Sequence, residues 1–276
     1  ALEWNPCMTT YKENAVKIPA REVGAAILSD QIGYAVQPFF NTTTQSISGA
    51  ECLLRWRLED GSFVPLEHYL KTFVSLEWQA PYMNHLLEKK QTLFSAIRSV
   101  TPVDVHFNYT AEALKSSAFK SRVIEQLRRK QTDLRGWVIE ISEQGSGPMG
   151  TIIDDEDLVV LRNSGVKIAI DDFGVGHSNL ERIANVDADI LKLDRQFVAN
   201  SRRSERYISI LKHVRQLTNS LGMKLIAEGI ETAEQESMLT DVGIVEHQGF
   251  FRGRPTSPGE FLAKVRHQNL DEAMAE

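Results

Sequence analysis

The 276-residue sequence predicts an α/β fold, a (β/α)8 barrel of the TIM type with one antiparallel first strand. Short apolar runs rich in β-branched residues alternate with longer amphipathic stretches, which is the pattern of parallel βα units. Eight such runs within about 250 residues match the usual size of this barrel. A connection as short as 41–45 (NTTTQ) cannot hold a helical crossover, so the first strand must run against the second.

The expected strands are short apolar segments, some alternating with polar residues and some continuous. They cover residues 32–40, 46–56, 103–109, 136–142, 166–172, 188–194, 223–229 and 243–251. The first two should form an antiparallel hairpin, and the later strands, which follow helical segments, should be parallel.

Amphipathic helices are expected between the strands because apolar residues recur there at spacings of three and four. The clearest cover 84–100, 111–130, 155–165 and 204–222. Several of them end at glycine, which readily adopts the left-handed conformation found where helices stop. No segment repeats with a period of roughly 20 to 50 residues, so a solenoid is not expected.

Composition excludes several classes of protein. The net charge of −6 and the lack of a basic stripe argue against a partner that is a nucleic-acid polymer. The two cysteines, Cys7 and Cys52, form no CxxC pair, so neither a disulfide framework nor a thiolate zinc site is expected. No apolar stretch is long enough to cross a bilayer and no signal peptide is recognisable, so we expect a cytoplasmic domain.

The expected organisation is an N-terminal lead or linker (1–20), one barrel (21–268) and a C-terminal tail (269–276). No linker rich in Gly, Ser or Pro divides the barrel. The first residue is Ala and the lead is weakly patterned, so we expect a longer or processed protein, with an upstream regulatory or membrane domain outside this chain.

Polar residues stand where the apolar strands stop. In a parallel barrel these strand ends form one catalytic face. Any one of the residues can be a turn residue, but converging carboxylates repel one another unless cations lie between them. Divalent ions with oxygen ligands, such as magnesium, manganese or calcium, are therefore expected. The residues are Glu51 with Arg55, Asn108, Glu140, Asp171 with Asp172, Lys192, Glu228 with Glu231, and Gln248.

Two other interpretations concern the acidic pair and the histidines. Asp172, taken alone, can be the N-cap of a helix that begins near Ser178. The seven histidines form no HxH or HxxxH pair, which disfavours a His-rich zinc site. His106 and His247 are expected in the barrel wall or outer layer, whereas His177 lies in a glycine-rich turn and is placed to reach a partner or substrate.

Taken in their order along the chain, the segments that carry these polar residues resemble the motifs of the EAL-domain family, bacterial phosphodiesterases that open cyclic di-GMP. The matching segments are GAECLLRW, FNYT, EISE, IAIDDFGVGHSNL, ILKLDRQFV, IAEGIET and HQGFFRGRP. The resemblance extends from about residue 20 to residue 265. It implies a barrel with a reversed first strand, in agreement with the short hairpin.

The resemblance also implies two bound ions, Mg²⁺ or Mn²⁺, with Ca²⁺ expected to inhibit. Asp171 would bridge the two ions. The ligands of the first would be Glu51, Asn108, Glu140 and Asp171, and those of the second Asp171, Asp172 and, partly through water, Glu228.

Further roles follow from the same resemblance. Lys192 would orient or help deprotonate the attacking water, Gln248 would order water and phosphate, and Glu231 would hold the loop after the fifth strand. These three and Glu51 form the implied catalytic set. The implied substrate contacts are Gln37, Leu54, Arg55 on the non-scissile phosphate, Asp194, Gly229 and Pro255. A homodimer through the 171–180 loop region is expected.

The sequence departs from the family pattern outside the implied ligands. Cys52 replaces Ala, Ser142 replaces Thr, Val175 and His177 replace Thr and Tyr, and the segment 61–78 diverges. No ligand is missing, so the first hypothesis is metal-dependent hydrolysis of cyclic di-GMP to linear 5′-pGpG, which lowers second-messenger levels. The alternative is a catalytically weak domain that acts as a cyclic di-GMP receptor or protein-binding module. A third reading is hydrolysis of another phosphodiester.

Overall fold

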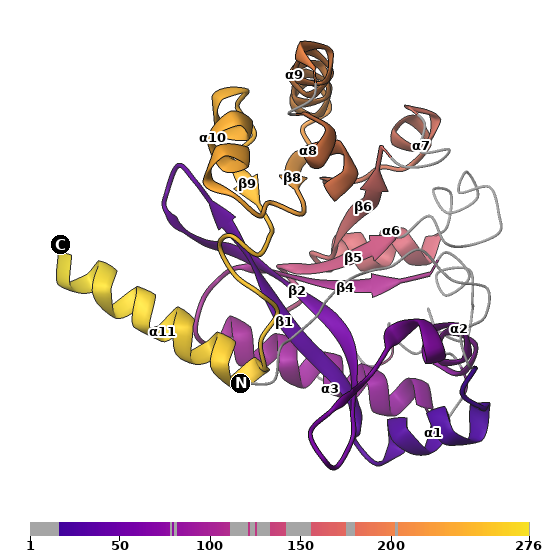
Figure 1. The fold of residues 1–276 in the computed structure, drawn as a ribbon. Helices are drawn as coiled ribbons and strands as arrows, with labels where there is room; N and C mark the ends of the chain where they lie inside the picture. Colours follow the sequence, from indigo (N-terminus) through magenta and orange to yellow (C-terminus); the bar gives the residue numbers. More distant parts are fainter. Residues whose placement is uncertain are drawn as a thin grey trace. The chain divides into compact units, whose positions relative to one another are not determined.

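Figure 1 shows the fold of the chain in a computed structural model. The structure describes residues 17–77, 79, 82–110, 121, 125, 133–141, 156–174, 180–201 and 204–275. The chain forms two compact units, the first from residues 1–33 and 54–86 and the second from residues 34–53 and 87–276.

The first unit is built on two helices, α1 (Ala20–Leu28) and α2 (Leu66–Leu76), and the short strand β3 (Phe63–Val64). Its buried core contains the ring pair Trp56 and Tyr69, which meet edge to face with centroids 5.3 Å apart. The core residues are Val23, Ala26, Ile27, Ile32, Trp56, Tyr69, Phe73, Leu76 and Leu86. The sequence pattern did not predict α1, α2 or β3.

The second unit contains the barrel predicted from the sequence. The sheet order is β1-β9-β8-β7-β6-β5-β4-β2, and pairing of β1 with β2 closes the ring. β1 is antiparallel to β9, whereas β2 and β4 through β9 pair with one another in parallel, so the predicted reversed first strand is confirmed. The strands are β1 (Ile32–Asn41), β2 (Ser46–Arg57), β4 (Asp104–Tyr109), β5 (Trp137–Ile141), β6 (Lys167–Phe173), β7 (Ile190–Leu193), β8 (Lys224–Ala227) and β9 (Glu246–His247).

Asn41 shapes the short turn between β1 and β2. Its side-chain oxygen accepts hydrogen bonds from the backbone N–H groups of Thr43 (2.8 Å) and Thr44 (3.0 Å). An Asn side chain that binds the backbone two residues ahead imitates a backbone turn. The sequence NTTTQ thereby makes the predicted tight hairpin.

Among the described residues, helices lie between most of the successive parallel strands (Figure 1). The predicted helices 84–100, 155–165 and 204–222 correspond to α3, α6 and α9, whereas nearly all of 111–130 lies outside the described residues. Among the described helices none has the length and apolar character needed to span a bilayer. The remaining bounds are α3 (Tyr82–Arg98), α6 (Glu156–Asn163), α7 (Leu180–Asn185), α8 (Arg195–Ser201), α9 (Glu205–Ser220), α10 (Ala233–Asp241) and α11 (Pro258–Ala275).

The barrel interior is layered, and this layering places the polar residues. One buried cluster is apolar and consists of Phe39, Val138, Ala169, Ile190 and Ile226. Side chains two residues apart on a strand share a face, so the next inward positions are polar: Glu140, Asp171, Lys192 and Glu228. Because β1 runs the other way, Gln37, two residues before Phe39, faces the same end of the barrel.

Candidate active site

Lys192 on β7 lies at the centre of a group of acidic side chains and is only 1% exposed. Its Nζ lies 2.6 Å from Glu228 Oε1, 2.8 Å from Glu140 Oε1, 3.2 Å from Asp171 Oδ1 and 3.4 Å from Glu51 Oε2. Burial alone would lower the pKa of Lys192, but the surrounding carboxylates, Asp171 foremost, raise that pKa well above its usual value. The lysine is therefore an ammonium ion shared by four carboxylates.

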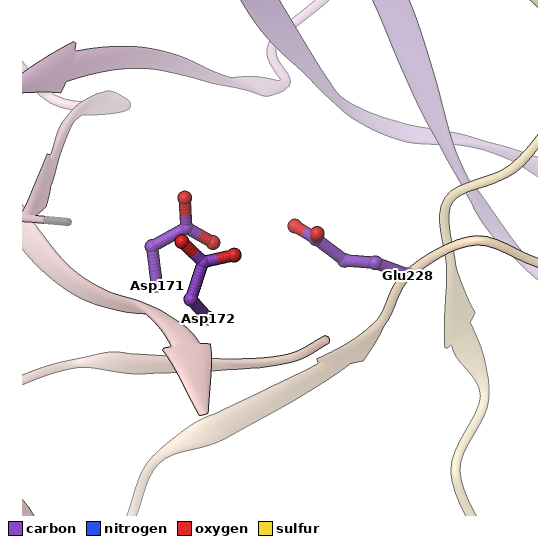
Figure 2. A group of neighbouring side chains, drawn as sticks. All are labelled: Asp171, Asp172 and Glu228. Atoms are coloured by element: carbon purple, nitrogen blue, oxygen red, sulfur yellow. The ribbon is translucent and has the colours of Figure 1, made fainter. Parts of the chain in front are cut away.

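Asp171, Asp172 and Glu228 form the part of this group best suited to a metal ion. Each offers one oxygen, and these oxygens lie within 4.8 Å of one another. Figure 2 shows the carboxylates of Asp171 and Asp172, at the end of β6, pointing toward that of Glu228, which follows β8. Oxygens at this mutual distance can share a divalent cation whose ligand distances are roughly 2.0–2.6 Å.

Successive residues of a regular strand face opposite sides, so the shared direction of Asp171 and Asp172 needs an irregular strand end. The pairing of β6 with β7 shifts register between Ile170 and Phe173. Asp172 has a φ of +56°, a left-handed conformation that Asp tolerates better than most residues. This local irregularity turns both carboxylates into the site.

Neutral amides hold Glu51. Asn108 Nδ2 donates to Glu51 Oε1 (2.8 Å), and Gln248 Nε2 donates to Glu51 Oε2 (2.7 Å) and to Gln37 Oε1 (3.2 Å). Gln37 in turn donates to the carbonyl of Gly253 (3.0 Å). Burial raises the pKa of Glu51, but Lys192 and the two amide donors outweigh it, so the net shift of that pKa is downward. Glu51 is thus held as an ionised carboxylate.

The group fits hard divalent cations. Glu140 Oε2 and Gln248 Oε1 are buried oxygens without a hydrogen-bond partner among the described residues. The five carboxylates, faced by the ammonium of Lys192, leave four negative charges, which is the charge that two divalent cations would neutralise. Carboxylate and amide oxygens are also the donors that such ions prefer.

Crowding of these carboxylates predicts a pH dependence of the metal-free protein. Burial, followed by the charge of Asp171, raises the pKa of Asp172 to about 7, and burial raises the pKa values of Glu140 and Glu228 well above their usual range. Groups that keep protons in the folded state stabilise it at low pH, and this contribution is lost as the pH rises through the folded pKa. Chelator-treated protein should therefore become less stable to urea as the pH rises from about 6.5 to about 8.

The histidines set the lower limit of that window. Burial lowers the pKa values of His106 and His247 from 6.5. These two groups therefore make the folded protein more stable as the pH rises, but only up to a pH of about 6.5, and above it they no longer oppose the loss caused by the carboxylates. Saturating Mg²⁺ should remove the loss, because a bound cation favours the ionised carboxylates. A metal-free stability that rises across this window would show that the carboxylates are not crowded as described.

The other implied site residues are placed as follows. Glu231 is exposed, and most of the loop that it would hold, 175–179, lies outside the described residues, as do Ser142 and His177. Asp194 accepts a hydrogen bond from the backbone of Gln196 (2.7 Å) at the start of α8. Pro255 is buried in the second unit, and Leu54 and Arg55 belong to the first unit.

Gly229 is required at its position next to Glu228. Its φ is +69°, and a Cβ atom there would lie 2.2 Å from Cβ of Arg195. A side chain would therefore clash as well as strain the backbone. The glycine lets the chain turn sharply directly after Glu228.

The expectation that His106 lies in the wall or outer layer is wrong. Its Nδ1 lies 2.6 Å from Glu140 Oε1, and both side chains are buried in the barrel interior. A signal was present in the sequence, because His106 stands two residues before Asn108 and so shares its face of β4. His247, in contrast, hydrogen-bonds to the carbonyl of Ile244 (2.8 Å) and lies near Glu236 on α10.

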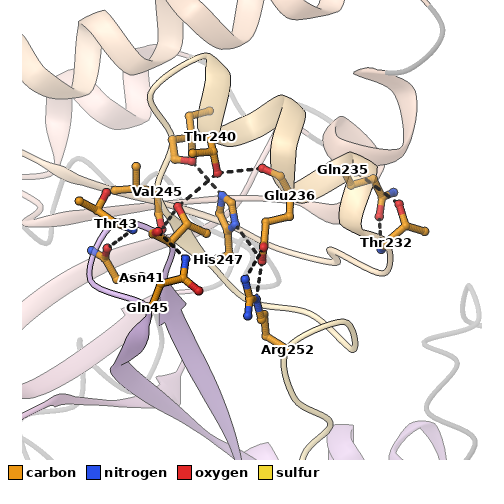
Figure 3. Close-up of polar contacts among 12 residues, drawn as sticks. Asn41, Thr43, Gln45, Thr232, Gln235, Glu236, Thr240, Val245, His247 and Arg252 are labelled. Carbon is orange, nitrogen blue, oxygen red and sulfur yellow. Dashed lines mark hydrogen bonds and ion pairs between the residues drawn. The ribbon is translucent and has the colours of Figure 1, made fainter. Parts of the chain in front are cut away.

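A second polar group, drawn in Figure 3, ties α10 to the segment that follows Gln248. Arg252 makes two hydrogen bonds to Glu236, one of 2.7 Å from Nε to Oε2, and its guanidinium lies 4.1 Å from the ring centroid of Phe40. His247 Nδ1 is 3.8 Å from the same carboxylate. The turn that carries Gly253, the partner of Gln37, is thus anchored to a helix.

Removing one partner of this ion pair should cost stability. Arg252→Met leaves Glu236, which is 12% exposed, without its main partner, so we expect a loss of about 1–3 kcal/mol in the free energy of unfolding measured with urea. The control is Arg135→Met. Arg135 and Asp133 are 80% and 53% exposed, so a change below about 0.5 kcal/mol is expected. Equal losses in both variants would contradict the anchoring role.

Comparison with known proteins identifies the family of this chain. The family model described as "EAL domain" matches residues 20–255. The chain is 32% identical over 251 residues to the probable cyclic di-GMP phosphodiesterase PdeN of Escherichia coli K12, covering 88% of this chain and 47% of that protein. It is 30% identical over 222 residues to the cyclic di-GMP phosphodiesterase RocR of Pseudomonas aeruginosa, covering 78% of this chain and 55% of that protein.

Solved structures share the fold. An EAL domain protein from Listeria monocytogenes EGD-e superposes with a TM-score of 0.74 at 24% identity, covering 91% of this chain and 98% of that chain. The chain spans about half the length of the curated relatives that it matches. The matched range takes in every strand of the barrel and every residue of the acidic group, and the chain belongs to the EAL domain family.

Proposed function

We propose that the chain hydrolyses cyclic di-GMP to linear 5′-pGpG with two divalent cations, Mg²⁺ or Mn²⁺. The observation that carries the proposal is the group of five buried or half-buried carboxylates at the mouth of the barrel, four of which surround one lysine. Such a group is electrostatically costly unless cations occupy it. The names of the relatives supply the substrate, since PdeN is described as a probable cyclic di-GMP phosphodiesterase and RocR as a cyclic di-GMP phosphodiesterase.

The proposed ligands fall into two overlapping sets. Asp171 is common to both, so it would bridge the ions. The first set is Glu51, Asn108, Glu140 and Asp171, and the second is Asp171, Asp172 and Glu228. Bound ions of this kind lower the pKa of a water molecule and neutralise charge on a phosphate.

Lys192 and Gln248 would act on water and phosphate. The ammonium of Lys192 would stabilise the negative charge that develops on the phosphate as the water oxygen bonds to phosphorus and the bond to the 3′ oxygen breaks. The Nε2 of Gln248 is committed to Glu51 and Gln37, so its unpartnered Oε1 is the atom that would accept a hydrogen bond from the water. The proton released by the water ends on the 3′ oxygen of the product.

The remaining proposals rest on the similarity of sequence segments. The substrate contacts would be Gln37, Leu54, Arg55, Asp194, Gly229 and Pro255, and Glu231 would hold the loop after β6. Ca²⁺ would occupy the metal site and inhibit. The proposal also includes a homodimer through the 171–180 region, an upstream regulatory or membrane domain and a cytoplasmic location. It divides the chain into a lead or linker (1–20), the barrel (21–268) and a tail (269–276).

The decisive experiment is to incubate the purified chain with cyclic di-GMP and Mg²⁺ or Mn²⁺ and to follow the nucleotides by chromatography. We expect linear pGpG, no product after addition of chelator, and no product from Glu51→Ala. Nucleotide binding is measured in parallel by calorimetry. If the wild type binds cyclic di-GMP but does not hydrolyse it with either metal, the chain is a receptor and the enzyme proposal is wrong. If it hydrolyses other phosphodiesters instead, the proposed substrate is wrong.

A further inference from the structure

The two oxygens of Glu140 have different surroundings. Oε1 is contacted by two nitrogen atoms, His106 Nδ1 at 2.6 Å and Lys192 Nζ at 2.8 Å. Oε2 is buried and has no hydrogen-bond partner among the described residues. The carboxylate therefore has one oxygen engaged by two nitrogen atoms and one to which no described group donates a hydrogen bond.

His106 is held firmly in the interior. It is 1% exposed, and the ring of Phe39 meets the imidazole edge to face, with centroids 4.6 Å apart and planes at 81°. On the sheet it pairs with Val138, two residues before Glu140 on the neighbouring strand. The imidazole thus reaches from the apolar layer of the barrel to the carboxylate above it.

The chemistry of the pair fixes which group donates. A carboxylate that binds a metal ion is ionised and can only accept hydrogen bonds. The hydrogen must then sit on Nδ1 of His106. An oxygen engaged by both His106 and Lys192 is a poorer metal ligand than its unpartnered neighbour, and the fixed imidazole prevents the carboxylate from exchanging the two oxygens.

We propose that His106 is a positioning residue, whose Nδ1–H binds Oε1 of Glu140 and thereby presents Oε2 as the single oxygen ligand for a divalent cation. The proposal rests on the proposed metal-dependent function. It goes beyond that function because the family resemblance assigns no role to His106. Hydrogen-bond partners of metal ligands commonly change metal affinity by about 10- to 100-fold when they are removed.

The test is Mn²⁺ affinity without nucleotide, measured by electron paramagnetic resonance on the whole chain. His106→Leu should bind Mn²⁺ about 10- to 100-fold more weakly, whereas His106→Asn, which keeps an N–H donor near the position of Nδ1, should stay within a few-fold of the wild type. The matched control is His247→Leu. His247 is equally buried but binds the carbonyl of Ile244, so its loss should leave Mn²⁺ affinity unchanged.

A spectroscopic measurement covers the case in which His106→Leu does not fold. Two-bond ¹H–¹⁵N spectra of the Mg²⁺-loaded wild type, labelled at histidine, should show His106 as the neutral tautomer with hydrogen on Nδ1. Wild-type Mn²⁺ affinity in His106→Leu, an equal loss in His247→Leu, or hydrogen on Nε2 of His106 would each overturn the proposal. Neither measurement uses cyclic di-GMP, so absent turnover would count against the proposed function alone.

Discussion

Replacing Lys192 with methionine should lower the free energy of unfolding of the metal-free protein by about 3–5 kcal/mol. Methionine is similar in length but carries no charge, so four carboxylates would lose the cation that they share. Leaving buried charges uncompensated is among the costliest single changes in a protein interior. Urea unfolding in the presence of a chelator measures the loss.

Lys167→Met is the matched control for this prediction. Lys167 pairs with Asp104 at 2.8 Å, but it begins β6, on a strand adjacent to that of Lys192, and is 43% exposed. Its loss should cost less than about 1 kcal/mol. Turnover of Lys192→Met should fall at least about 100-fold, whereas Lys167→Met should keep most of its activity. A Lys192 variant as stable as the wild type in chelator would contradict the electrostatic description of the site.

Asp171→Asn should separate stability from activity. The change keeps the shape of the side chain but removes one negative charge from a group in which Asp171 raises the pKa values of Glu140, Asp172 and Glu228. Metal-free protein should therefore be at least as stable as the wild type near neutral pH. Turnover should fall by about 1,000-fold or more, because the proposed bridging ligand of both ions is lost.

Asp104→Asn provides the comparison for Asp171→Asn. Asp104 lies at the start of β4 and its carboxylate contacts Lys167. Its substitution should leave turnover within a few-fold of the wild type. The interpretation of Asp171 is wrong if Asp171→Asn retains activity. It is also wrong if Asp171→Asn loses activity only because the protein unfolds, and circular dichroism and urea midpoints measure that unfolding.

Most of the barrel could be predicted because its strands are short apolar segments, continuous or alternating with polar residues, and its first connection is too short for a helix. The polar site could also be predicted from the strands, because residues two apart on a strand share a face. Glu140 follows the apolar Val138 in this way, and Lys192 follows the apolar Ile190. Glu51 shows the limit of this reasoning. It is not at a strand end, because β2 continues to Arg57.

The helices outside the clear amphipathic pattern could not be predicted from periodicity. The segment of α10, AEQESMLTD, is largely polar, and what starts it is a capping box in which Thr232 and Gln235 bind each other's backbone. That signal is local and easily overlooked beside a search for apolar spacing. The first unit was missed although α1 and α2 are amphipathic, because its core forms from segments that precede and follow the barrel's first hairpin in the sequence.

His106 and the ion pair of Arg252 with Glu236 could not be assigned from the sequence either. A histidine on an apolar strand fits a packing role as well as a polar one. The register of β4 with β5 sets His106 opposite Val138, and only the structure shows its imidazole reaching Glu140, two residues further along β5. Arg252 and Glu236 are separated by a strand and a turn, so nothing local indicates that they meet.

The number of divalent ions bound per chain tests the central claim most directly. The claim is that the five carboxylates are stable together because two cations neutralise them. Titration of chelator-treated protein with Mn²⁺, with free ion detected by electron paramagnetic resonance, should give two ions per chain for the wild type and fewer for Asp171→Asn. No bound ion, or a number unchanged in Asp171→Asn, would contradict it.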